Sequence, residues 1–230
     1  MKHTLEKGLA PLGLTLTDSQ KDTLCQFGEA LLEKNKVMNL TAIKTPEGVA
    51  NLHFLDALAL LNTADLKGKS VIDVGCGAGI PGVPLKIGEE SISLTLLDSL
   101  GKRMDWLREV LPTLSVEAEV VTARAEEFAQ DHREGYDICV SRAVARLNIL
   151  TELCLPLVKV GGRFIAMKGA LAEEEVAEAQ NAMGALGGKV KEIIGYQIED
   201  ATHYAVVVEK IRPTPTQYPR DFGKIKKKPL

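Results

Sequence analysis

The sequence predicts an α/β fold: a seven-stranded, mostly parallel sheet with helices on both faces, a C-terminal antiparallel hairpin and an N-terminal helical extension. Three observations predict it. Short apolar runs alternate with amphipathic segments from Ser70 onward, a glycine-rich turn follows the first run, and the last two runs are joined without a helix. We place the extension at residues 1–65, the α/β domain at 66–211 and a basic tail at 212–230.

The extension is expected to be helical. Thr17 and Gln20 have the spacing of a capping box, and apolar residues follow them at helical intervals. A second helix should begin at Thr45-Pro46-Glu47, because proline suits the first helical position, and should continue through HFLDALALL.

Seven apolar runs are predicted to be strands, and helices are expected between the first six. The strands are residues 71–75, 93–98, 116–122, 136–141, 163–168, 189–198 and 203–211. The helices are residues 81–87, 102–111, a short segment after Arg124, 148–159 and 171–186. A ligand of such a sheet binds beyond the carboxyl ends of the strands, near the switch point.

Composition excludes several classes of protein. At 45% hydrophobic and 26% charged residues, the chain has enough apolar residues for a core, and no run suggests a membrane span or a signal peptide. The four cysteines lack paired spacing, which favours reduced thiols over disulfides or zinc. We therefore expect a cytoplasmic, monomeric protein without a metal.

Charge is unevenly distributed along the chain. Residues 212–230 contain six basic side chains and one acid, whereas the first 211 residues carry 22 basic and 30 acidic residues. A polyanion would therefore meet a basic tail on an acidic body.

The glycine turn lies in the stretch VIDVGCGAGIPGVPLKI and raises the question of its ligand. A P-loop is excluded because no Gly-Lys-Ser/Thr follows. Gly77 to Gly82 satisfies the dinucleotide fingerprint, but Asp73 stands ahead of every glycine, where a carboxylate is unfavourable beside a phosphate. It suits a cationic ligand without phosphate, and Asp-x-Gly-x-Gly-x-Gly is the usual signature for S-adenosylmethionine. An NAD-dependent oxidoreductase remains a weaker alternative.

Other positions agree with this cofactor. Asp98 ends the second strand, where an acid can accept both ribose hydroxyls. Ala125 and Glu126 follow the third strand and could read the adenine edge, and Arg142 follows the fourth. With the turn, the predicted cofactor site comprises Asp73, Gly75, Gly77, Gly79, Ile80, Asp98, Ala125, Glu126 and Arg142.

The sequence lacks the motifs of several methyltransferase classes, which reduces the range of possible methyl acceptors. Ser141-Arg142-Ala143-Val144 stands where exocyclic-amine methyltransferases carry Asp/Asn-Pro-Pro-aromatic, and there is no Pro-Cys for pyrimidine carbon-5 chemistry. No His/Asp pair stands out as a general base, so no catalytic residue is assigned. Guanine N7 has a free lone pair and needs no base, which permits this acceptor without proving it. A small-molecule or protein acceptor also remains possible.

Several segments together resemble the bacterial 16S ribosomal RNA guanine-N7 methyltransferases, also called glucose-inhibited division protein B. They are KVMNLTAI (36–43), HFLD (53–56), the 73–87 turn, RAE (124–126), SRA (141–143), GG (161–162), MKG (167–169) and the tail YPR…PL (218–230). The resemblance implies a Rossmann-like S-adenosylmethionine-dependent methyltransferase fold and methyl transfer to N7 of a guanosine in 16S rRNA. It implies Gly75, Ile80, Ala125, Glu126 and Arg142 as cofactor residues.

The partner implied is 16S rRNA or the 30S particle. The residues expected to contact RNA are Lys168, Arg212, Arg220, Lys224, Lys226 and Lys227, because phosphate neutralisation is local. Ile225 departs from the family pattern, in which proline is common at this position.

Overall fold

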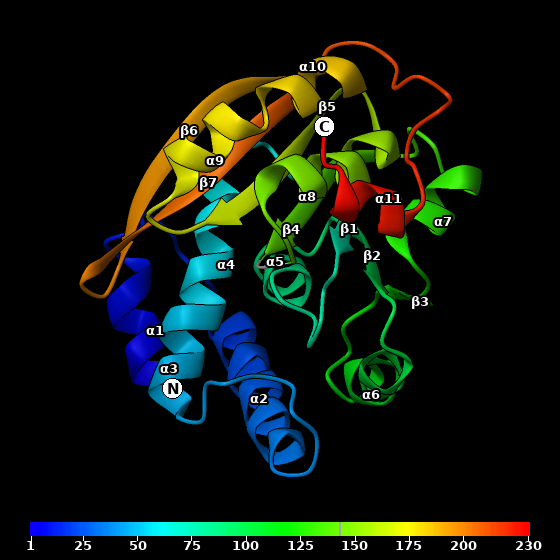
Figure 1. The fold of residues 1–230 in the computed structure, drawn as a ribbon. Helices are drawn as coiled ribbons and strands as arrows, with labels where there is room; N and C mark the ends of the chain where they lie inside the picture. The colour runs from blue at the N-terminus through cyan, green and yellow to red at the C-terminus, as the bar shows by residue number, and fades with distance from the viewer. Residues whose placement is uncertain (143) are drawn as a thin grey trace.

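The computed structural model describes residues 1–142 and 144–230, which form a seven-stranded sheet flanked by helices (Figure 1). The strand order is β3-β2-β1-β4-β5-β7-β6. The first five strands run parallel, and β7 pairs antiparallel with both β5 and β6. The strands are β1 (Ser70–Val74), β2 (Ser93–Asp98), β3 (Glu119–Thr122), β4 (Tyr136–Arg142), β5 (Val158–Lys168), β6 (Gly188–Ile198) and β7 (Ala201–Lys210). The predicted sheet and its C-terminal hairpin are confirmed.

The first 62 residues supply a helical layer: α1 (Lys2–Leu9), α2 (Asp18–Asn35), α3 (Pro46–Val49), η1 (Ala50–Leu55), α4 (Asp56–Leu58) and η2 (Ala59–Asn62). The capping box is present, since the Gln20 amide donates to Thr17 Oγ1 at 3.2 Å and the Thr17 amide donates to Gln20 Oε1 at 2.9 Å. The second predicted helix starts at Pro46 but changes character, because η1 is a π-helical turn and η2 a 3₁₀ turn.

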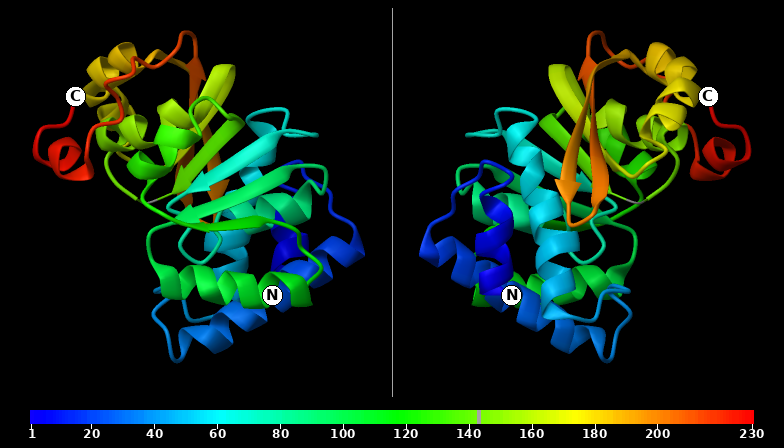
Figure 2. Two further views of the ribbon diagram at one scale, coloured as in Figure 1. Left: turned by 90° about the vertical axis from the view of Figure 1, so that its right-hand side faces the viewer. Right: turned by 90° about the vertical axis from the view of Figure 1, so that its left-hand side faces the viewer.

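Each face of the sheet has its own core, because successive strand residues point to opposite faces. Val71 and Ile138 pack in the core shared with the extension, α5 (Gly82–Gly88) and α6 (Gly101–Thr113). Ile72 and Cys139 face the opposite core, which contains α7 (Ala125–Asp131), α8 (Leu147–Cys154), α9 (Ala172–Glu178) and α10 (Gln180–Leu186). The two side views show these layers (Figure 2).

The extension is joined to the sheet through an aromatic cluster. Phe27 of α2 stacks on Phe54 of η1 and on Trp106 of α6, with ring centroids 5.9 and 6.0 Å apart. Phe27 and Phe54 have no exposed area, so the extension and the sheet share one core. The chain division at residues 65 and 211 stays a prediction.

Most predicted boundaries are shifted by one or two residues, and the larger differences from the structure are the following. β3 begins at Glu119 rather than at 116. The helix predicted for residues 148–159 ends at Cys154, because Pro156 sits in a 3₁₀ turn (η3, Leu155–Leu157) and β5 starts at Val158. The helix predicted for 171–186 is two helices, with Ala179 between them at φ −87° and ψ 0°.

The C-terminal segment, residues 212–230, is packed rather than free. It contains the helix α11 (Phe222–Lys227), whose Ile225 is fully buried in the core that includes α8. The sequence did not predict this helix. Among the helices of residues 1–142 and 144–230, none has the length and apolar character needed to traverse a bilayer.

Candidate functional site

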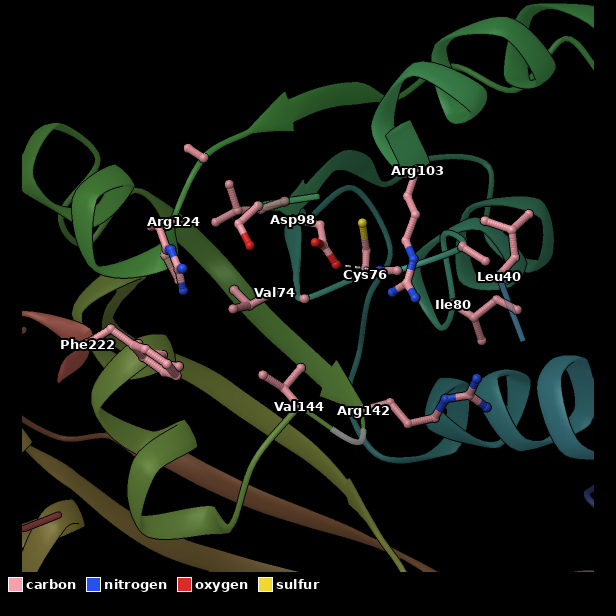
Figure 3. A pocket seen from close by; sticks show the side chains of 18 of the residues that line it. Leu40, Val74, Cys76, Ile80, Asp98, Arg103, Arg124, Arg142, Val144 and Phe222 are labelled. Atoms are coloured by element: carbon pink, nitrogen blue, oxygen red, sulfur yellow. Dashed lines mark hydrogen bonds between the residues drawn. The ribbon is translucent and has the colours of Figure 1, made fainter. Parts of the chain in front are cut away.

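A cavity of about 390 Å³ opens where the carboxyl ends of β1, β2, β3 and β4 meet (Figure 3). It lies at the switch point, because the strand order runs from β1 to β2 and β3 on one side and to β4 and β5 on the other. The predicted cofactor residues that line it are Gly75, Gly77, Ile80, Asp98, Ala125, Glu126 and Arg142. Asp73 and Gly79 were also predicted, and neither is among the lining residues.

The glycine turn presents bare backbone to this cavity. Gly75, Gly77 and Gly79 have φ angles of +70°, +56° and +84°, which glycine adopts without strain. A Cβ on Gly75 would clash with the Val144 side chain, which lies directly against this glycine. The Gly75 amide donates to Leu97 O at 2.8 Å, which fixes the turn against the end of β2.

Two acids border the cavity next to this turn. Asp98 Oδ2 accepts a hydrogen bond from the Gly77 amide at 3.0 Å, and its Oδ1 accepts one from the Leu100 amide at 2.9 Å. Glu126 lies in the first turn of α7 and is only 9% exposed. Asp98 and Thr122 are register partners on β2 and β3, so both acids stand at the same edge of the sheet.

Asp73 lies behind the turn and is not among the residues that line the cavity, so its predicted contact with the ligand stays a prediction. It is fully buried, and its Oδ2 accepts a hydrogen bond from the Gly82 amide at 2.7 Å. Its Oδ1 has no hydrogen-bond partner among the described residues. Burial raises the pKa of Asp73 to about 7, which the Gly82 hydrogen bond and the charge of Arg142 only partly offset. The observed contact ties the end of β1 to the start of α5.

Arg142, at the end of β4, is held by the extension. Its guanidinium donates to Leu52 O at 2.8 Å, lies 3.0 Å from His53 Nδ1 and forms an ion pair with Asp56 at 3.4 Å. Asp56 Oδ1 also accepts from Tyr196 Oη at 2.9 Å and lies 2.8 Å from His203 Nδ1. The HFLD segment therefore fixes an arginine at the cavity wall.

His53 is enclosed in the same network. Its Nε2 lies 2.8 Å from Thr41 Oγ1, and burial, together with the neighbouring Arg142, lowers its pKa to about 4. A neutral ring that accepts from Arg142 at Nδ1 and donates to Thr41 from Nε2 satisfies these two contacts, and Nδ1 also lies 3.1 Å from Leu52 O. His53 thus has neither nitrogen available as a base in this arrangement.

The family model described as rRNA small subunit methyltransferase G (GidB) matches residues 20–203. The chain belongs to this family. Relatives named ribosomal RNA small subunit methyltransferase G match over nearly their whole length. One from Alkaliphilus metalliredigens is 48% identical over 235 residues, covering 100% of this chain and 98% of the relative. One from Clostridium botulinum (strain ATCC 19397 / Type A) is 42% identical over 234 residues, covering 99% and 98%.

Solved structures agree on the fold. The PH0226 protein of Pyrococcus horikoshii superposes with a TM-score of 0.58 at 15% identity, covering 77% of this chain and 98% of that one. A ribosomal protein L11 methylase from Lactobacillus delbrueckii subsp. bulgaricus has a TM-score of 0.53 at 16% identity, covering 70% and 80%. The chain has the Rossmann-like methyltransferase fold, as the sequence predicted.

Members of the methyltransferase G family depend on S-adenosylmethionine, and the cavity suits this cofactor. Gly75 and Gly77 line the cavity without side chains, and the carboxylates of Asp98 and Glu126 are unfavourable neighbours for a pyrophosphate. Within residues 1–142 and 144–230, no group of three or more His, Cys, Asp or Glu side chains is arranged to hold a metal ion.

A second hollow, of about 650 Å³, adjoins the first and shares His53, Arg142 and Val144 with it. Lys168, predicted to face RNA, lies in its wall. The Lys168 side chain is only 6% exposed, and its Nζ pairs with Glu175 at 2.7 Å and donates to Ala145 O at 2.8 Å. Lys168 is thus an enclosed, paired group rather than an exposed one. Ala143, the last residue of the SRA segment, lies outside the described residues.

The other predicted RNA-contacting residues fall into two groups. Arg220 pairs with the fully buried Glu152 at 2.6 Å, and Arg212 donates to Gly184 O, so both guanidinium groups are engaged by the protein itself. Lys224, Lys226 and Lys227 are exposed on α11.

Sequence reasoning missed several cavity residues, among them Thr41, His53, Arg103, Arg124, Leu153 and Phe222. Thr41 and His53 lie in segments that resemble the family, and this resemblance could have indicated that they line the site. Phe222 carried no signal, because only the fold of the C-terminal segment brings it to β3 and β4.

Proposed function

We propose that the protein transfers a methyl group from S-adenosylmethionine to N7 of a guanosine in the 16S rRNA of the small ribosomal subunit. The observation that carries this proposal is a cavity built on a glycine turn at the switch point, with a second hollow beside it, in a chain of the methyltransferase G family.

The first cavity is proposed to hold the cofactor. The Asp98 carboxylate is placed to accept the ribose hydroxyls, and the Ala125 backbone and the Glu126 carboxylate border the part that would hold adenine. The glycine turn would run beneath the methionine part, beside Ile80. We infer that Asp73 acts indirectly, by fixing this turn through Gly82.

The second hollow is proposed to admit the acceptor base. Bound S-adenosylmethionine supplies a methyl group on a positively charged sulfur. The lone pair of guanine N7 can attack it without losing a proton, so the chain needs to orient the reactants rather than supply a base. The engaged nitrogens of His53 agree with this chemistry. Arg142, held between the two hollows by Leu52, His53 and Asp56, is proposed to orient the base.

RNA is proposed to approach over α11. Phe222 of this helix lines the first cavity, while Lys226 and Lys227 of the same helix are exposed and have no ion-pair partner among the described residues. Their charge can neutralise backbone phosphates without breaking a contact within the protein.

Nucleoside analysis tests the proposal. Purified protein and labelled S-adenosylmethionine are incubated with 30S particles, or with naked 16S rRNA, from a strain that lacks this gene. We expect the label in 7-methylguanosine on one of these substrates. Arg142→Ala should reduce the product at least about tenfold, because misplaced reactants lose effective molarity. Arg163→Ala is the control, because Arg163 is a half-buried arginine in the middle of β5 that lines neither hollow. Label in another nucleoside or in ribosomal protein would refute the proposed acceptor.

A further inference from the structure

The C-terminal segment contributes a wall of the cofactor cavity. Phe222, the first residue of α11, is half-buried, and its ring points into the cavity (Figure 3). The Arg124 guanidinium lies over this ring, with Cζ 5.4 Å from the ring centroid. Leu40 and Arg142 lie at the other end of the same cavity (Figure 3).

Strong contacts hold this segment in place. The Arg220 amide and guanidinium both bind the Glu152 carboxylate of α8, at 2.9 and 2.6 Å, and that carboxylate is fully buried. Arg133 donates to Tyr218 O at 2.6 Å and to Thr214 O at 2.8 Å. Ile225 is buried one turn after Phe222. The position of Phe222 is therefore set by several contacts that bracket it along the chain.

The chemistry at this end of the cavity suits a purine. Phe222, Leu153, Ala123 and Ala125 supply apolar surface, and Glu126 adds one acceptor group at the edge. Asp98, the proposed ribose partner, stands on the neighbouring strand end. A flat ring with an exocyclic amino group matches this combination, since aromatic side chains stack on bases and a carboxylate accepts from an amine.

We propose that Phe222 is a cofactor-binding residue, and that its ring forms the surface against which the adenine of S-adenosylmethionine packs. This inference rests on the proposed function and adds to it a role for the C-terminal segment. The segment completes the donor site and carries the exposed lysines on the same short helix. Binding of the nucleoside should therefore stabilise α11, because a ligand stabilises the conformation that it contacts.

One experiment is ruled out by this geometry. Deleting residues 212–230 would remove Phe222 and uncover the buried Glu152 together with the lysines. Loss of activity in that truncation would not separate RNA contact from cofactor binding. Single substitutions in the full chain are therefore needed.

Calorimetry with S-adenosylhomocysteine and with adenosine, on the full chain, tests the inference. Phe222→Ala should weaken both ligands about tenfold, in the range found for base–aromatic contacts, and Phe222→Leu should weaken them less. Phe128→Leu is the matched control: Phe128 is also half-buried, stacks on His132 and does not line the cavity. Hydrogen exchange of residues 222–227 should slow when S-adenosylhomocysteine binds to the wild type.

Each result has a defined meaning. Wild-type affinity in both Phe222 variants would overturn the inference and leave the proposed function intact. Failure of the wild type to bind S-adenosylhomocysteine would overturn both. If Phe222→Ala loosens α11 without ligand, as faster exchange would reveal, Phe222→Leu decides. That variant keeps apolar contact, so a loss of affinity with unchanged exchange assigns the effect to the ring.

Discussion

At the residue scale, the Asp73 carboxylate has an unusual environment. It is fully buried, one oxygen accepts from the Gly82 amide, and the other oxygen has no partner among the described residues. The charged form therefore lacks the solvation that a surface acid has, which is why the pKa rises to about 7 from the ordinary value of 3.8. An acid in this state costs stability at neutral pH and fixes the turn through one hydrogen bond.

We predict that Asp73 makes the protein less stable as pH rises from about 4 to 7. In that window the folded protein keeps a proton that the unfolded chain has released, so the free energy of unfolding falls by up to roughly 1.4 kcal/mol per pH unit. Asp73→Asn keeps an oxygen for Gly82 and removes the titration. The wild type should lose stability relative to this variant across the window and run parallel to it above pH 7.

Urea unfolding at a series of pH values provides the measurement. Asp200→Asn, an exposed acid in the β6–β7 turn, is the control and should leave the pH profile of stability unchanged. Parallel curves for the wild type and Asp73→Asn from pH 4 to 7 would contradict the account of this carboxylate.

The positions of residues were predictable from the sequence where they depend on strand ends. Asp98, Ala125 and Glu126 directly follow or end apolar strands, so the parallel sheet brings them to one edge. The orientation of the Asp73 carboxylate was not predictable. The alternation of side chains along β1 gives the face of the sheet on which it lies, but not whether it meets a ligand or the Gly82 amide. The ion pairs of Lys168 and Arg220 were not predictable either. They depend on how α9 and α8 pack, because these helices carry Glu175 and Glu152.

At the element scale, α11 combines two properties on opposite sides. Ile225 faces the core, and Lys224, Lys226 and Lys227 face solvent. The short helix is stabilised by packing, since an isolated helix of this length would not form. The apolar side chain of Ile225 allows this helix to be buried along one side.

Changing the charge on α11 should affect RNA and spare the fold. We predict that Lys226→Gln combined with Lys227→Gln weakens binding to 30S particles and lowers the slope of log affinity against log salt by up to about 2. Lys189→Gln with Lys191→Gln removes the same charge from the exposed β6 edge and serves as the control. Filter binding over a salt series measures both. Equal losses in the two pairs would show that α11 has no special part in RNA contact.

Elements were predictable to the extent that local pattern determines them. The strands that form the sheet centre are continuous apolar runs, and the capping box at Thr17 marks the start of α2. The elements that were predicted wrongly depend on tertiary contacts. β5 starts earlier than predicted because Val158 pairs with Tyr136, and α11 forms because Ile225 packs against α8. The change to a π-helical turn in η1 has no signal that we can identify in its sequence.

At the scale of the whole molecule, three parts of the chain meet at one cavity. The extension supplies Thr41 and His53, the sheet supplies the glycine turn and the acids, and the C-terminal segment supplies Phe222. The hydrogen bonds and ion pair around Arg142 connect the extension to β4, β6 and β7. They therefore join the N-terminal helices to the centre of the sheet and to its C-terminal hairpin. The site is thus a product of the complete fold rather than of the sheet alone.

The central claim is that the bare backbone at the switch point holds a methyl donor. Calorimetric titration of the full chain with S-adenosylhomocysteine and with NADH, for the wild type and for Gly75→Val, tests it most directly. A valine at this position would demand a side chain at φ +70° and would collide with Val144. We predict that S-adenosylhomocysteine binds the wild type with one site, that NADH does not bind, and that the variant loses at least about tenfold in affinity. Binding of NADH, or undiminished S-adenosylhomocysteine binding to Gly75→Val, would contradict the claim.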